Sequence, residues 1–162
     1  MKLGNGQFGG AKLGDIRNTI TSALKKEIEK HDLLAETPSP LEHINHFLEQ
    51  AGMDLDRAEN SLEEKDYKWS IVQSYYSMFN AARAVLFKLG FRDKKHYVII
   101  SVLEELSKLG LLEMRYVDDF KASMRSREDA NYRSTYSLET ANFILEVAKE
   151  FLNRMKLLVK AI

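Results

Sequence analysis

The sequence has 162 residues, of which 44% are hydrophobic and 30% are charged, and this mix is typical of one soluble globular domain. Its 24 basic and 24 acidic residues cancel, which argues against a protein that coats nucleic acid through net positive charge but leaves room for a local basic site. The absence of cysteine excludes disulfides and thiolate metal sites, and no apolar run approaches the roughly 18 residues of a membrane span, so we expect a cytoplasmic protein.

Residues 1–38 are predicted to form an extension outside the main domain. Five of the eight glycines lie in the first fourteen residues, which indicates a flexible start. Residues 4–9 match the dinucleotide fingerprint G-x-G-x-x-G, but no strand precedes them, so we interpret them as part of this start. A helix is expected over 15–34, and its apolar stripe is thin enough to need the main domain or a partner. The stripe consists of Ile16, Ile20, Leu24 and Ile28.

Residues 39–162 are predicted to form a helical bundle. The first helix opens on a capping box from Ser39 to Glu42 and runs to about residue 65. The next helix covers about 66–90, and its middle, SIVQSYYSMFNAARAVLF, contains a single charge, Arg83. Such a helix is buried on several sides, which places it at the centre of the bundle. Its polar side chains then need partners in or near a core: Gln73, Ser74, Asn80 and Arg83.

Three further helices complete the prediction. One covers about 96–109 and stops at Gly110, one covers about 112–129, and the last runs from a Ser137 cap to about residue 160. The expected fold is therefore all-α, an antiparallel bundle of four to five helices with an extra N-terminal helix.

Several groups of side chains before residue 100 are candidates for a functional role. His43 and His46 are three residues apart on one helix, but no further ligand is evident, so we predict no metal site. The pair Tyr75 and Tyr76 is expected to be core, with the alternative that one phenol reaches a polar site. A basic loop at 92–96 leads into a helix start, where it forms either a solvated turn or an anion site.

The stretch RSREDANYR, at 125–133, holds three arginines and two acids in nine residues. Arg127 suits phosphate oxygens, Asn131 can offer an amide to a base edge, and Tyr132 can stack or donate a hydrogen bond. A purely structural alternative is that Arg127 pairs with Asp66 or Asp129 and locks two helices together.

The order of three segments along the chain resembles the HEPN domain family (higher eukaryotes and prokaryotes nucleotide-binding), and it is closest to small stand-alone archaeal and bacterial members. The segments are DYKWSIVQSYYSMFNAARAVL at 66–86, KKH at 94–96 and REDANY at 127–132, before a last helix that follows YSLETA. The resemblance covers about residues 41–160. It implies an antiparallel bundle that pairs as a homodimer. Some members are metal-independent ribonucleases, often toxins, and others act beside small nucleotidyltransferases.

The ribonuclease signature of that family is an arginine followed, after four to six residues, by a histidine. Arg127 matches the arginine, but Tyr132 stands where the histidine is expected, and no histidine follows His96. A phenol is a poorer proton acceptor than imidazole at neutral pH, and losing a general acid–base group typically costs about 10²–10⁴ in rate.

We therefore favour a nucleotide- or RNA-binding or interaction module that acts with a small nucleotidyltransferase in a toxin–antitoxin-like system. One alternative is a metal-independent endoribonuclease with a degenerate motif in which Arg127 is catalytic with Tyr132. Another is a purely structural, scaffolding helical dimer. No cofactor is expected, and ATP or another nucleotide is the candidate small ligand. The expected binding residues are Arg127, Asn131, Tyr132, Lys95, His96 and Tyr76.

Overall fold

The computed structural model describes residues 13–31, 41–92 and 96–162, and every regular element within these ranges is a helix. The all-α prediction is confirmed. The helices are α1 (Leu13–Ala23), α2 (Lys25–His31), α3 (Leu41–Glu63), α4 (Tyr67–Lys88), α5 (His96–Lys108), α6 (Met114–Tyr132) and α7 (Leu138–Ala161). The Gly-rich fingerprint and the Ser39 part of the predicted capping box lie outside the described residues. No helix in the described ranges is long and apolar enough to cross a membrane.

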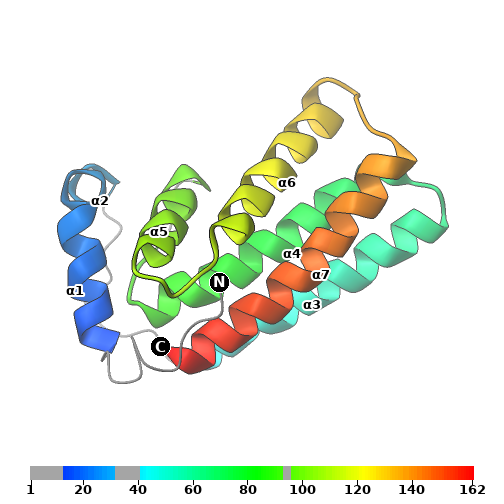
Figure 1. Cartoon of the computed structure of the whole chain (residues 1–162). Coiled ribbons are helices and arrows are strands. Elements are labelled where there is room, and N and C mark those ends of the chain that lie inside the picture. The colour runs from blue at the N-terminus through cyan, green and yellow to red at the C-terminus, as the bar shows by residue number, and fades with distance from the viewer. Residues whose placement is uncertain (1–12, 32–40, 93–95) are drawn as a thin grey trace.

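Four long helices form the bundle. α3, α4, α6 and α7 run in alternating directions along one common axis (Figure 1), as expected for an antiparallel bundle with short connections. The shorter α5 packs across the end of α4 and against α6, and α1 contacts the far side of α5.

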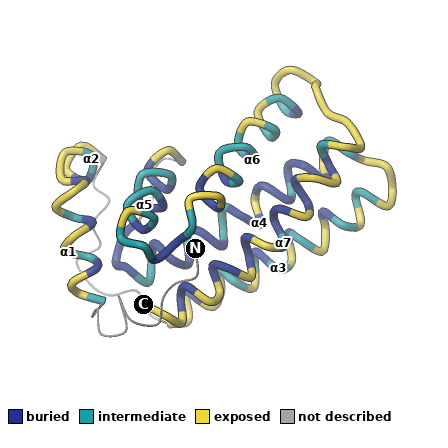
Figure 2. Tube along the Cα trace, in the orientation of Figure 1, coloured by how far each residue is buried: buried dark blue, intermediate teal, exposed yellow. Residues whose placement is uncertain are grey.

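α4 is the central helix, as predicted. It packs against α3, α6 and α7, and Figure 2 shows most of its length as buried. Small side chains on α4 let α3 approach closely. The hydroxyls of Ser70 and Ser77 on α4 donate to the carbonyls of Ala58 and Ala51 on α3, at 2.9 and 2.8 Å. The backbones of α3 and α4 are thereby joined at two points about two turns apart.

Two of the polar side chains of α4 singled out by the sequence hydrogen-bond to α3. Asn80 Nδ2 donates to Asp54 Oδ2 at 2.9 Å, and the Gln73 amide lies 2.8 Å from Ser61 Oγ. The prediction that these groups need partners is thus confirmed for both amides. Ser74 is an exception, because its buried Oγ has no hydrogen-bond partner.

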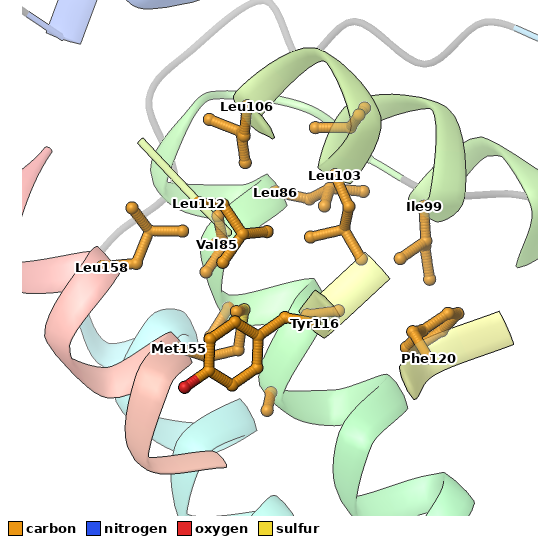
Figure 3. Packing of buried hydrophobic residues seen from close by; sticks show 14 of the residues in the cluster. Val85, Leu86, Ile99, Leu103, Leu106, Leu112, Tyr116, Phe120, Met155 and Leu158 are labelled. Carbon is orange, nitrogen blue, oxygen red and sulfur yellow. The ribbon is translucent and has the colours of Figure 1, made fainter. Parts of the chain in front are cut away.

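The largest cluster of buried hydrophobic residues contains side chains from each of the helices α1 to α7. Where α5 crosses the bundle, side chains of α4, α5, α6 and α7 converge (Figure 3). They include Val85, Leu86, Ile99, Leu103, Tyr116, Phe120, Met155 and Leu158. α5 is therefore part of the core of the bundle.

The N-terminal extension packs on the main domain. Its four predicted apolar residues are all buried and belong to the largest core cluster. The predicted single helix bends at Leu24, which separates α1 from α2, although its backbone amide still donates to Ile20. The apolar stripe is only one residue wide. It is enough to pack the extension on the main domain because buried residues of that domain form the other side of the contact.

Helix ends follow the predicted signals with one difference. Gly110 adopts a φ of 74° after α5, and Ser137 Oγ accepts from the Thr140 amide at the start of α7. α6, however, continues through Tyr132, three residues beyond the predicted end at 129. Tertiary packing explains the extension, because Ala130 is fully buried against Ile71 and Ala141.

Lys65, two residues after the end of α3, has a backbone conformation that favours glycine. Its φ is 62°, and the amides of Lys65 and Asp66 close the turn on the carbonyls of Leu62 and Ser61. We expect Lys65→Gly to raise the free energy of unfolding, measured by urea denaturation, by about 0.5–1 kcal/mol, because glycine adopts this φ without steric cost. Lys156→Gly, at an exposed position inside α7, should instead lower it by about 1 kcal/mol. A loss of stability in both variants would contradict this account.

Candidate functional site

The RSREDANYR stretch forms the last turns of α6 and its cap. From this helix the guanidinium of Arg127 lies over the ring of Tyr75 on α4, with Cζ 4.8 Å from the ring centroid. Tyr75 is fully buried, so the ring is a fixed platform. A guanidinium over an aromatic face is attracted by the ring electrons.

Arg127 has no carboxylate partner in the part of the chain that the structure describes. Its Nε is buried and makes no hydrogen bond. Neither acid proposed for a structural lock reaches it, because Asp129 pairs with Arg133 at 3.2 Å and Asp66 accepts from the Trp69 amide at 3.3 Å. A half-buried cation without a counter-ion is unusual, since such groups are normally paired. The Asp66 or Asp129 lock is therefore wrong.

Asn131 and Tyr132 lie in different directions from the helix. Asn131 follows Arg127 by one turn on the same face and is half-buried, whereas Tyr132 is turned by about 140° around the axis. The Tyr132 side chain is 77% exposed. Within one chain, the structure thus groups Asn131 with Arg127 and leaves Tyr132 on another face.

Tyr76 joins the same region through its neighbour on α4. Its ring centroid lies 5.4 Å from that of Tyr75, and its side chain is 39% exposed. The core interpretation is confirmed for Tyr75, whereas Tyr76 reaches the surface, and the polar site for a phenol stays a prediction. The sequence analysis missed Tyr75 as a site residue, although its place beside Tyr76 was the available signal.

The other two predicted binding residues, Lys95 and His96, precede or begin α5. Lys95 lies outside the described residues, and although His96 begins α5, its side chain also lies outside them. Their assignment stays a prediction. In the described ranges, no group of three or more histidine, aspartate or glutamate residues is placed to hold a metal ion.

The end of the bundle beyond Arg127 is rich in exposed apolar side chains. The start of α4, the end of α6 and the start of α7 meet there (Figure 1). The exposed residues are Trp69, Tyr132, Tyr136, Leu138 and Phe143. Exposed apolar side chains grouped in this way are typical of interaction surfaces.

Comparison with protein families identifies the chain. The model of the HEPN domain matches residues 44–158. The chain belongs to the HEPN domain family. The match spans the HEPN bundle from α3 to α7 and leaves α1 and α2 outside it.

Two relatives come from Methanocaldococcus jannaschii, and both are named "Putative toxin" (MJ0142 and MJ0605). The first is 26% identical over 116 residues, which cover 70% of this chain and 79% of the relative. The second is 28% identical over 123 residues, which cover 75% of this chain and 92% of the relative. The similarity therefore extends over most of each protein.

Proposed function

We propose that this protein is a toxin-like HEPN module that binds the phosphate groups of RNA through Arg127. The observation that carries the proposal is the Arg127 guanidinium, held on the Tyr75 ring without a carboxylate partner. A cation kept free of internal ion pairs has its charge available to an anionic ligand. The names of the two relatives support a toxin-like role.

The surroundings of Arg127 suit a nucleic acid better than an isolated phosphate. The buried Nε leaves the terminal nitrogens of the guanidinium as the groups that a ligand reaches. Asn131, on the same face, offers an amide to a base edge, and the exposed part of Tyr76 offers a surface for stacking. Arg125 is exposed nearby on α6 and adds positive charge.

A second copy of the chain is the partner that we propose for the apolar end of the bundle. Trp69, Tyr132 and Phe143 are each at least half exposed there, and burying them would stabilise a dimer. In such a dimer Tyr132, which points away from Arg127 of its own chain, would be placed at the interface. A small nucleotidyltransferase is the further partner, on the strength of the family resemblance, and a neighbouring gene for such an enzyme would support it.

RNA binding is tested by fluorescence anisotropy with a labelled single-stranded RNA. Arg127→Ala should weaken binding by about tenfold or more and lower the salt-dependence slope by about 0.7, the contribution of one lost phosphate contact. Arg115→Ala is the matched control, because it removes an exposed arginine of the same helix that pairs with Glu150. Its affinity should match that of the wild type.

Two results would contradict the proposal. One is an equal loss of affinity in both arginine variants, which would indicate a diffuse charge effect. The other is RNA cleavage in the presence of EDTA by the wild type and not by Arg127→Ala, which would replace the binding role with the endoribonuclease alternative. No imidazole follows Arg127 in the sequence, so we expect the RNA to remain intact.

A further inference from the structure

A cavity of about 380 Å³ lies where the start of α3 meets the end of α4. It is lined by His43, His46, Phe47, Phe87 and Arg92. Its size falls near the lower end of the range of roughly 300–1,000 Å³ that is usual for small-molecule sites. The Arg127 site plays no part in it, because Phe87 lies twelve residues, or about 18 Å, along α4 from Tyr75.

The apolar part of the cavity is a fixed aromatic surface. The rings of Phe47 and Phe87 meet edge to face, with centroids 4.8 Å apart and an interplanar angle of 60°. Both side chains pack against the main core. The guanidinium of Arg83 lies 4.5 Å from the Phe47 centroid, which fixes that ring further. A rigid aromatic wall of this kind suits a planar ring that stacks on it.

The polar part of the cavity consists of nitrogen donors. His43 and His46 are exposed and one turn apart on α3, and Arg92 is exposed just beyond the end of α4. No carboxylate is among the described residues that line the cavity. Imidazole and guanidinium groups around an opening favour an anion, and a phosphate group has three acceptor oxygens that such donors can share.

A metal ion does not explain the histidine pair. Two imidazoles need further ligands to hold zinc, and in the described ranges no third histidine, aspartate or glutamate joins them. The rings of Phe47 and Phe87 would also contribute no ligand to a metal ion. The pair is better explained by a ligand that uses both the donors and the rings.

We propose that this cavity is a second ligand site, which takes a planar aromatic ring carrying a phosphate group. The ring stacks on one of the two phenylalanine rings and contacts the edge of the other, and the phosphate accepts hydrogen bonds from Arg92 and the two histidines. This is the chemistry of one nucleotide unit, either free or within a single strand of RNA.

The test measures binding of AMP, adenosine and an adenylate tetranucleotide by calorimetry, with amide chemical shifts to locate the ligand. AMP or the tetranucleotide should shift the signals of residues 43–47, 87 and 92. Arg92→Ala should weaken that binding at least about tenfold, or about 1.4 kcal/mol, and adenosine should bind correspondingly weakly. Arg57→Ala, which removes an exposed arginine of α3 that pairs with Asp54 and lines neither the cavity nor the Arg127 site, should leave AMP binding and these shifts unchanged.

Each outcome decides the proposal. If AMP shifts the signals of the lining residues, the cavity binds a free nucleotide. If only the tetranucleotide shifts them, the cavity binds a strand of RNA. Both results support the site. Absence of shifts at the cavity with either ligand overturns it. Equal losses of AMP binding in Arg92→Ala and Arg57→Ala, or adenosine binding as tight as AMP, also overturn it. Since shifts at residues 43–47, 87 and 92 report the cavity and not the Arg127 site, failure here is distinct from failure of the Arg127 site.

Discussion

Replacing Arg154 with alanine is expected to lower the free energy of unfolding by about 3 kcal/mol, because it leaves a partly buried carboxylate without its counter-ion. The Arg154 side chain is only 9% exposed, and its Nε donates to Glu113 Oε2 at 2.8 Å. Its Nη2 donates to the carbonyl of Leu111, also at 2.8 Å. One arginine thus ties α7 to the segment between α5 and α6.

Urea denaturation of the two proteins measures this loss. Arg115→Ala is the control, since its ion pair with Glu150 is exposed on both sides, and such pairs contribute about 1 kcal/mol or less. A loss in Arg154→Ala no larger than in the control would show that the Arg154 contacts contribute little to the stability of the fold.

The contribution of this ion pair should also depend on pH. Burial by itself would raise the pKa of Glu113, but the hydrogen bond from Arg154, a backbone hydrogen bond and the charge of Arg154 lower the pKa below its ordinary value of 4.5. A carboxyl whose pKa is lowered by folding contributes stability that is present above its unfolded pKa and lost as the pH falls through the folded pKa. The stability difference between wild type and Arg154→Ala should therefore shrink as the pH is lowered from 6 to below 4.

The sequence predicted the central helix because its pattern is local. The uncharged run around Tyr75 and Met78 fixes α4 as buried whatever its neighbours are. The partners of its polar groups were not predictable, since Asp54 lies 26 residues before Asn80 and its role depends on how α3 and α4 align. The end of α6 was placed too early for the same reason, because burial of Ala130 depends on helices distant in the sequence.

For the candidate site, the sequence indicated the stretch around Arg127 but not how its side chains are distributed around the helix. Arg127 and Tyr132 occupy the arginine and histidine positions of the family signature, yet within one chain a helix turns them to different faces. The contact between Arg127 and Tyr75 joins residues 52 positions apart, and no spacing rule within one segment predicts it. A local motif thus identified the arginine, and only the packing of α4 on α6 identified the platform beneath it.

Replacing Tyr75 with leucine is expected to weaken RNA binding by about tenfold, because a cation–π contact contributes about 1–2 kcal/mol when it is partly desolvated. This prediction depends on the proposed role of Arg127. Tyr75 does not need to touch the ligand, since its ring positions the guanidinium above it. Tyr75→Phe keeps the ring and should bind RNA nearly as tightly as the wild type.

The salt dependence of binding separates positioning from charge. Tyr75→Leu leaves every positive charge in place, so its salt slope should equal that of the wild type, whereas Arg127→Ala should lower the slope by about 0.7. The leucine variant should also lose roughly 2 kcal/mol of stability, because a fully buried ring is lost from the core. Binding is therefore compared at temperatures where every variant is folded. If Tyr75→Leu binds RNA as tightly as Tyr75→Phe does, the ring has only a structural role, and Arg127 binds phosphate without its platform.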